Sequence, residues 1–246
     1  MNERPITIGA TGGSGTRVLV EILEKAGVYM GGPKRNGAGD AMPFEAPIRN
    51  RARKYLTGKL PPESMKNEFL VAVRTHRHAM KNPEGCWGWK NPRGMFFFDF
   101  YARHLFPEVR IVHLVRDGRD MAFSRNKGQL KPFGFLLPPK TEAWVDTSRK
   151  ALLWMVGNTV VADRGEALGD QYLRLRFEDL CATPEGTIPR LLVHVGIEVE
   201  DDALTRLAAL VKPPPTIGRW REYSNGEQIE DLIRPALVRF GYLEDT

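Results

Sequence analysis

Short apolar runs alternate with segments of helical periodicity along most of this chain. The apolar runs Ile6–Ala10, Val109–Val115 and Tyr172–Phe177 predict buried strands. Strands that alternate with helices are typical of βαβ units. The pattern therefore predicts an α/β fold with three layers, α/β/α, around a central parallel sheet. The predicted helices cover residues 18–26, 64–80, 93–105, 141–168, 184–195, 201–211 and 227–239.

The length and regularity of the chain favour one domain. Its 246 residues fit one large α/β domain or two small ones. The sequence has no internal repeat, low-complexity block or linker that would divide it, so we expect a single domain over residues 1–246. Residues 127–140 are rich in Gly and Pro and predict a long loop, and long loops often cover a functional site.

The composition is that of an ordinary globular protein. With 42% hydrophobic and 27% charged residues, the chain is excluded from the disordered and fibrous classes. The formal net charge of +6 favours anionic partners. The densest basic segment, Arg49–Lys54, is interpreted either as a solvated helix face or as a rim that attracts an anion. Elsewhere the positive charge is dispersed, so we expect no nucleic-acid partner.

Cysteine usage and the absence of long apolar runs limit where the protein resides. Two cysteines, Cys86 and Cys181, exclude a disulfide framework and a multi-cysteine metal site, and we expect reduced, buried thiols and no metal. No apolar run approaches the roughly 18 residues of a membrane helix. The first strand begins near Pro5, which leaves no room for a signal peptide. The sequence thus predicts a cytoplasmic protein without membrane contact.

A glycine-rich turn joins the first predicted strand to the first predicted helix. Its glycines permit backbone angles at which consecutive N–H groups point at one anion, and the helix N-terminus adds partial positive charge. The hydroxyls of Ser14 and Thr16 add donors, and Arg17 is the only cation of the turn. The candidate anion-binding residues are Gly12, Gly13, Ser14, Gly15, Thr16 and Arg17.

This turn differs from two common nucleotide-binding motifs. It lacks the lysine that a Walker A loop carries before its Ser or Thr, and it does not match G-x-G-x-x-G. A glycine turn can also serve only to join a strand to a helix, so the spacing alone leaves the ligand open.

A second candidate anion site follows the strand that ends at Val115. Arg116 stands at the carboxyl end of this strand, where open α/β sheets bind ligands. Its guanidinium carries a permanent charge in a geometry suited to phosphate, and Ser124 is a neutral donor eight residues later. The alternative is a local helix-capping network of Arg116, Asp117, Arg119 and Asp120.

Taken together, these segments resemble the PAPS-dependent sulfotransferases. The apolar strand with Arg116-Asp-x-Arg-Asp and a Ser eight residues after the first Arg resembles the family's 3′-phosphate motif. Gly13–Thr16 is similar to its 5′-phosphosulfate loop, and Tyr172–Leu180 to a strand that ends in Tyr-Glu-Asp-Leu. Ile217–Arg221 resembles the segment that closes over the nucleotide. These motifs run from residue 8 to about residue 221, nearly the whole chain.

The resemblance implies a P-loop NTPase-like fold and a site for PAPS, 3′-phosphoadenosine 5′-phosphosulfate. It implies that Arg116 and Ser124 bind the 3′-phosphate and that residues 12–17 bind the 5′-phosphosulfate. It further implies in-line transfer of the sulfuryl group to a hydroxyl or amine, with PAP leaving. Because the sulfuryl group carries a single negative charge, Mg²⁺ is not demanded for its neutralisation.

Four further residues are assigned to the nucleotide by the same resemblance. Phe177 stands at the family's aromatic position after the third predicted strand. Gly218 belongs to the closing segment, and Arg219 and Trp220 would flank the adenosine end. An alternative interpretation makes Trp220 a core residue packed by Tyr223.

The chain departs from the family at the leaving-group cation. The family carries a Lys or Arg before Ser-Gly-Thr, where this chain has Gly13. Charge that develops on the departing phosphate needs a cation or donor aimed at it. We interpret either Lys90 or Arg17 as the replacement. Lys90 follows a short predicted strand, Trp87–Trp89, and resembles a Lys-x-Pro element of the carbohydrate and protein-tyrosine branches; otherwise it is an ordinary surface lysine.

The acceptor hydroxyl needs a general base within hydrogen-bond reach. Asp40 follows the first helix, where other branches of the family carry acidic bases, and is the first candidate. Glu45 and His76 are further candidates. His76 and His78 lie in a predicted helix, however, and we interpret both as surface histidines without a catalytic role.

The predicted function is sulfuryl transfer from PAPS to an unidentified small-molecule or carbohydrate acceptor. One alternative is a non-catalytic nucleotide-binding protein of the same fold. Another is a P-loop kinase, whose Walker lysine and metal-binding Asp are both missing here. One aromatic segment is interpreted either as an acceptor pocket or as core. Its members are Trp87, Trp89, Phe96, Phe97 and Phe98.

Overall fold

The structure is a computed structural model that describes residues 4–32, 35–126 and 130–244. In this part of the chain, four parallel strands form one sheet in the order β2-β1-β3-β4. They are β1 (Ile6–Ala10), β2 (Gly88–Lys90), β3 (Arg110–Val115) and β4 (Tyr172–Arg176). Strand β1 is buried along its whole length, as expected for a parallel sheet covered on both faces.

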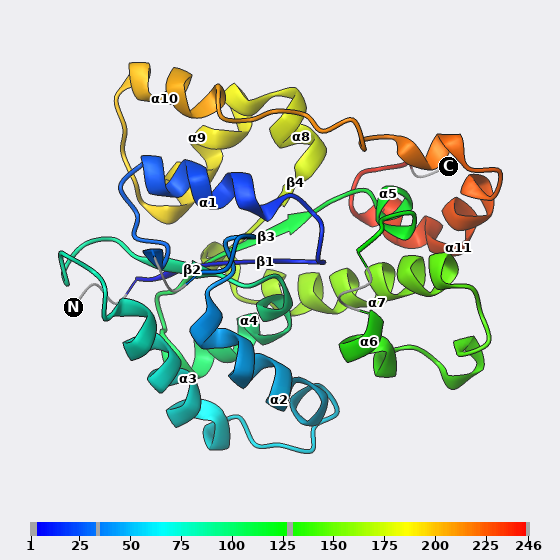
Figure 1. Cartoon of the computed structure of the whole chain (residues 1–246), viewed down its shortest axis with the longest axis horizontal. Coiled ribbons are helices and arrows are strands. Elements are labelled where there is room, and N and C mark those ends of the chain that lie inside the picture. Colours follow the sequence, from blue (N-terminus) through cyan, green and yellow to red (C-terminus); the bar gives the residue numbers. More distant parts are fainter. Residues whose placement is uncertain (1–3, 33–34, 127–129, 245–246) are drawn as a thin grey trace.

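Helices cover both faces of the sheet (Figure 1). One layer comprises α1 (Thr16–Lys25), α8 (Phe177–Ala182), α9 (Pro184–Val195) and α10 (Asp201–Ala208). Side chains on alternate positions of the strands, such as Ile8 and Val112, pack against this layer. Because successive strand residues point to opposite faces, the neighbouring residue Ile111 packs on the other side.

The second layer is richer in aromatic residues. It comprises α2 (Glu45–Leu56), α3 (Glu63–Arg77), α4 (Phe98–Phe100) and α7 (Asp146–Glu166), below the sheet in Figure 1. The three short or terminal helices α5 (Gly118–Ala122), α6 (Leu130–Phe133) and α11 (Gly226–Arg239) lie at one side. The aromatic segment named above is core, since all its members are buried in this layer: Trp87, Trp89, Phe96, Phe97 and Phe98.

The predicted three-layer α/β fold is confirmed, and most element boundaries lie within a few residues of the prediction. The strand at Ile6–Ala10 and the helix at Pro184–Val195 have the predicted bounds. The helix predicted over 141–168 is shorter, because a 3-10 turn at Pro139–Thr141 precedes it. The predicted third strand stops one residue early, and Phe177 begins α8 instead.

Two predictions of local structure were wrong. Residues 93–105 do not form one α-helix: 3-10 turns at Pro92–Phe97 lead into α4 and then into a π-helical turn at Tyr101–Leu105. Residues 94–98 of this segment are all buried, so no polar face imposes a regular helical period there. The predicted loop at 127–140 contains α6 and further 3-10 turns within its described part, and residues 127–129 lie outside the described residues.

The thiols also differ from expectation. Cys86 is exposed and Cys181 is half-buried, whereas both were expected in the core. Among the helices of the described residues, none has the length and apolar character needed to cross a membrane.

Candidate active site

The carboxyl ends of β1 and β2 border a cavity of about 1000 Å³. The turn after β1 forms one wall, Lys90–Arg93 at the end of β2 a second, and Asn36–Glu45 a third. Phe177 and the segment 210–214 close the far end. A crevice outside the carboxyl ends of the strands is where open α/β sheets bind ligands.

The turn after β1 has the backbone of an anion-binding loop. Gly13 and Gly15 take left-handed conformations, with φ of +98° and +88°. Gly15 also has no room for a side chain, because a Cβ there would lie 2.2 Å from the Phe177 ring. Thr16 begins α1, so the helix N-terminus faces the cavity. The backbone or side chains of Gly12, Gly13, Gly15, Thr16 and Arg17 line the cavity.

The Ser14 hydroxyl is turned inward. It donates to the Thr11 carbonyl at 2.7 Å and lies 2.9 Å from the Thr11 hydroxyl. Ser14 is buried and does not line the cavity. Its side chain therefore stabilises the shape of the turn, and an anion would meet the backbone of the turn and Thr16.

Lys90 ends β2 and points its ammonium group at the acidic wall of the cavity. Nζ donates to Asp40 Oδ1 at 2.5 Å and to the Ala38 carbonyl at 2.7 Å. The residue is 2% exposed, so it is not a surface lysine. Burial lowers the pKa of Lys90 below its ordinary value, and the hydrogen bond to Asp40 opposes this shift. Asp40 also accepts a hydrogen bond from Asn36 Nδ2 at 3.0 Å.

A second cation–carboxylate pair stands beside the first. Arg93 Nη1 donates to Glu45 Oε1, and Asn91 Nδ2 donates to Glu45 Oε2 at 3.2 Å. Asn91 also accepts the Arg93 N–H at 3.1 Å and so begins the 3-10 turns that follow β2. All three residues line the cavity. Neither Asn91 nor Arg93 was among the site residues predicted from the sequence.

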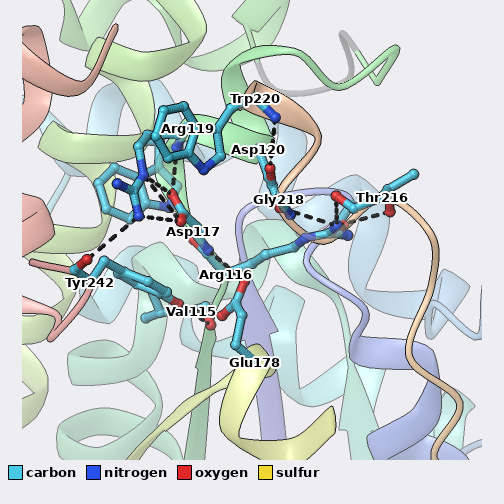
Figure 2. A network of polar contacts seen from close by, with 12 residues as sticks. Val115, Arg116, Asp117, Arg119, Asp120, Glu178, Thr216, Gly218, Trp220 and Tyr242 are labelled. Atoms are coloured by element: carbon cyan, nitrogen blue, oxygen red, sulfur yellow. Dashed lines mark hydrogen bonds and ion pairs between the residues drawn. The ribbon is translucent and has the colours of Figure 1, made fainter. Parts of the chain in front are cut away.

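Arg116 reaches from the end of β3 toward Thr216, as Figure 2 shows. Its Nη2 donates to the carbonyl and hydroxyl of Thr216 at 2.8 and 2.9 Å, and Nη1 is 3.4 Å from the Gly13 carbonyl. The guanidinium carbon lies 5.0 Å from the centre of the Phe177 ring. Nε of this buried guanidinium has no hydrogen-bond partner. Arg116 is therefore held beside the glycine turn with donor capacity to spare.

Ser124 joins Arg116 at the turn. A Cβ on Gly13 would lie 3.7 Å from Ser124 Oγ, so the hydroxyl is next to the backbone of the turn. Lys150 of α7 donates to the Ser124 carbonyl at 2.6 Å and fixes this segment. The sequence did not predict this contact, because nothing in the helical pattern around Lys150 indicates that its side chain reaches Ser124, 26 positions away.

The helix-capping network that the sequence offered as an alternative also exists, with different members. Asp117 caps α5 by accepting the Arg119 N–H at 2.8 Å. The Arg119 guanidinium pairs with both Asp117 oxygens and donates to Glu230 of α11 at 2.6 Å (Figure 2). Arg116 also faces the turn and forms a separate ion pair with Asp120, with Nη2 3.8 Å from Oδ2.

Asp120 ties the segment 216–220 across the site. Its two oxygens accept the N–H groups of Gly218 at 2.8 Å and Trp220 at 3.2 Å (Figure 2). Gly218 is left-handed, with φ of +77°. Trp220 is half-buried between Arg119 and Arg221, whose guanidinium carbons lie 4.4 and 4.7 Å from its ring.

The remaining members of this segment bear on the predicted adenosine contacts. Tyr223 stacks on Phe123 rather than on Trp220. Burial, and then the charge of Arg116, lower the pKa of Arg219. The segment thus meets Arg116 through Thr216. Of the predicted nucleotide contacts, six do not line the cavity: Ser14, Arg116, Ser124, Gly218, Arg219 and Trp220.

His76 lies apart from the cavity. It is fully buried in α3, with Nε2 2.8 Å from the Gly88 carbonyl and its ring against Tyr29 and Phe44. The interpretation as a surface histidine is therefore wrong: it is a core residue. Burial lowers its pKa to about 4. His78, in contrast, is exposed.

The fold and site together define an α/β transferase with anion-binding groups at the carboxyl ends of its strands. The chain belongs to the sulfotransferase family, whose model matches residues 5–201. No curated protein matches the sequence. Family membership favours sulfuryl transfer over the kinase alternative, and the protein is a sulfotransferase enzyme.

Solved structures with the same fold are distant in sequence. The sulfotransferase domain of the Synechococcus PCC 7002 olefin synthase has a TM-score of 0.57 at 17% identity, over 98% of this chain and 96% of that chain. A Mycobacterium avium sulfotransferase has a TM-score of 0.57 at 11% identity, over 99% and 77% of the two chains. A mouse sulfotransferase complexed with PAP has a TM-score of 0.52 at 12% identity, over 100% and 87%. These likenesses concern the fold.

Proposed function

We propose that this sulfotransferase takes its sulfuryl group from PAPS and transfers it to a hydroxyl of a small-molecule or carbohydrate acceptor. The observation that carries the proposal is the position of Arg116, a buried guanidinium 3.4 Å from the Gly13 carbonyl in an anion-binding turn. The protein's sites for the two anionic groups of PAPS, the 3′-phosphate and the 5′-phosphosulfate, would then adjoin at Gly13.

The residues present fit such a ligand. Among the described residues Arg116 Nε is buried without a hydrogen-bond partner. Nη2 donates hydrogen bonds to the neutral oxygens of Thr216, with the Asp120 carboxylate 3.8 Å away. A phosphate would accept stronger, charge-assisted hydrogen bonds from the same atoms. Ser124 adds a hydroxyl beside Arg116, and residues 12–17 present backbone N–H groups and the N-terminus of α1. Gly218, Arg219 and Trp220 would cover the adenosine end.

Lys90 takes the role of the missing loop cation in this proposal. It lies in the cavity wall opposite the turn, already bonded to a carboxylate. Arg17 also lines the cavity but is exposed to solvent, where its charge is screened. An ammonium group that is 2% exposed stabilises developing negative charge more strongly.

Asp40 is the proposed general base. Its oxygens accept from Lys90 and Asn36, and each oxygen keeps a further lone pair for an acceptor hydroxyl. PAPS supplies the sulfuryl group. The bond between its sulfur and the bridging phosphate oxygen breaks, the acceptor oxygen bonds to sulfur, and PAP leaves. The acceptor proton passes to the Asp40 carboxylate, and Lys90 holds that carboxylate in place. Glu45 is the second candidate, because its pair with Arg93 faces the same cavity.

Calorimetric titration with PAP, 5′-AMP and ATP-Mg²⁺ tests the donor site. The wild-type protein is expected to prefer PAP over 5′-AMP, which lacks the 3′-phosphate. In Arg116→Ala this preference should fall by roughly 10- to 150-fold, because a hydrogen bond to a charged group contributes about 1.5–3 kcal/mol. Arg110→Ala removes the same charge from the other end of β3 and should leave the preference unchanged.

Two results would contradict the proposal. Tighter binding of ATP-Mg²⁺ than of PAP would favour a kinase-like site. An unchanged preference for PAP in Arg116→Ala, with a folded protein by thermal unfolding, would show that the 3′-phosphate binds elsewhere.

A further inference from the structure

The acceptor end of the cavity is polar. If the nucleotide fills the end near Arg116 and Phe177, the acceptor faces the wall formed by residues 36–49 and 90–93. The aromatic residues that could have formed a flat apolar pocket are buried in the core instead. Apart from Ala38, Met42 and Pro92, the side chains at this end carry amides or charges. A hydroxyl-rich acceptor fits this wall better than a flat phenol.

The charges at this end do not cancel. Asp40 and Glu45 are each neutralised by a cation, Lys90 and Arg93 respectively. Arg49 is exposed, lines the same cavity one helical turn beyond Glu45, and takes part in none of the ion pairs among the described residues. One positive charge therefore remains at the entrance for acceptors.

The positive charge continues along α2. Arg53 lies four residues after Arg49, about 6 Å further along the same helix face, and borders a second cavity of about 630 Å³. Lys131 and Arg149 line that cavity too, opposite Glu142 and Asp146. Arg149 Nε is buried there without a hydrogen-bond partner. Arg49 and Arg53, on successive turns of α2, thus each border a cavity.

We propose that the acceptor is an acidic, hydroxyl-rich molecule of more than one sugar unit, such as an oligosaccharide that contains uronic acid. Its reacting hydroxyl lies at Asp40, and Arg49 and Arg53 bind its carboxylates along α2. This inference rests on the proposed function, since it assumes that the nucleotide occupies the other end of the cavity. Arg49 and Arg53 are then specificity-determining residues.

Binding to the PAP-loaded protein tests the inference by calorimetry. The probes are a tetrasaccharide of alternating glucuronate and N-acetylglucosamine, a neutral N-acetylglucosamine tetramer, and 2-naphthol. We expect the acidic tetrasaccharide to bind at least tenfold more tightly than the neutral one, with an affinity that falls as salt rises. The double variant Arg49→Ala/Arg53→Ala should lose roughly tenfold in affinity for the acidic probe, because each exposed ion pair contributes up to about fivefold.

The matched control is Arg51→Ala/Lys54→Ala, which removes two positive charges from the same helix at positions that line neither cavity. It should bind the acidic probe as the wild type does. Equal losses in both double variants would reduce the effect to net charge and overturn the inference. So would tighter binding of the neutral tetramer or of 2-naphthol, or binding of no probe at all. Because PAP binding is measured first, its absence would instead identify a failure of the proposed function.

Discussion

The ends of β2 and β3 each carry a buried cation paired with a carboxylate, but the two pairs face different surroundings. Arg119, beyond β3, is enclosed by Asp117, by Glu230 of α11 and by the ring of Trp220. Lys90, at the end of β2, is bonded to Asp40 and borders a cavity. Burial and pairing alone therefore do not distinguish a scaffold contact from a site. What distinguishes them is the surface that each pair faces, which is protein for Arg119 and a cavity for Lys90.

This difference predicts different consequences of losing each cation. Arg119 joins α5 to α11. Among the described ion pairs Asp117 has no other cation, whereas Glu230 also pairs with Arg234. Asp40 is nearly a quarter exposed in its side chain and keeps Asn36 as a partner. Removing Arg119 should chiefly lower stability, and removing Lys90 should chiefly lower turnover.

Arg119→Ala has the largest expected effect. The change leaves Asp117 without its cation inside the protein and removes an interhelical contact. We expect the free energy of unfolding to fall by about 3–5 kcal/mol, the usual cost of breaking a buried pair. Urea unfolding followed by circular dichroism measures it. The control is Arg206→Ala, which breaks an exposed pair with Asp202 and should cost less than about 1 kcal/mol. Similar losses in the two variants would remove the distinction between the two regions.

Lys90→Met should lower turnover by roughly 10²–10³-fold, as expected when a donor that stabilises developing charge is removed. The assay is PAP release from PAPS, with any acceptor to which the wild type transfers. The free energy of unfolding of Lys90→Met should change less than that of Arg119→Ala. Arg17→Met is the matched comparison, since Arg17 lines the same cavity. A larger loss of turnover in Arg17→Met would transfer the leaving-group role to the loop.

The pH profile adds a test of the same residue. Burial lowers the pKa of Lys90, so its charge is lost on the alkaline side sooner than that of an ordinary lysine. Turnover should therefore decline with rising pH, and Lys90→Arg should move this decline to higher pH, because arginine stays charged.

The sequence predicted the parts of the site that depend on local pattern. The turn at 12–17 and Arg116 each follow a strand with clear periodicity, so their place at the carboxyl edge of the sheet follows from the fold class. Lys90 and Asp40 were both proposed, yet nothing in the sequence indicated that they would pair across 50 residues.

The rest could not be predicted because it depends on tertiary contacts. The Arg93–Glu45 pair joins α2 to the end of β2, and neither residue carries a local signal. Helical periodicity placed His76 on a helix, but its burial depends on the Gly88 carbonyl and on the aromatic residues around it. The irregular segment 92–105 has a core, residues 94–98, that is buried on all sides, and no periodic pattern describes such burial.

Acidification has the smallest expected effect per residue and tests both strands separately. His76 supports β2 through the Gly88 carbonyl, and His113 lies within β3 between Tyr172 and Asn158. Burial lowers their pKa values to about 4 and about 3. Near pH 5 the unfolded chain binds protons at these positions and the folded chain does not, so stability falls as pH drops below about 6.5.

Between pH 7 and pH 5 each buried histidine should cost roughly 2 kcal/mol of unfolding free energy. Replacing either one, as His76→Gln or His113→Gln, should make the slope of stability against pH shallower by about one proton, whatever the variant's stability at pH 7. His78→Gln removes an exposed histidine two residues after His76 and should leave the slope unchanged. If only one of the buried variants alters the slope, the strand beneath the other histidine is already open to protons in the folded state. The regions around β2 and β3 would then differ in the protection of their buried histidines, as well as in the surroundings of Lys90 and Arg119.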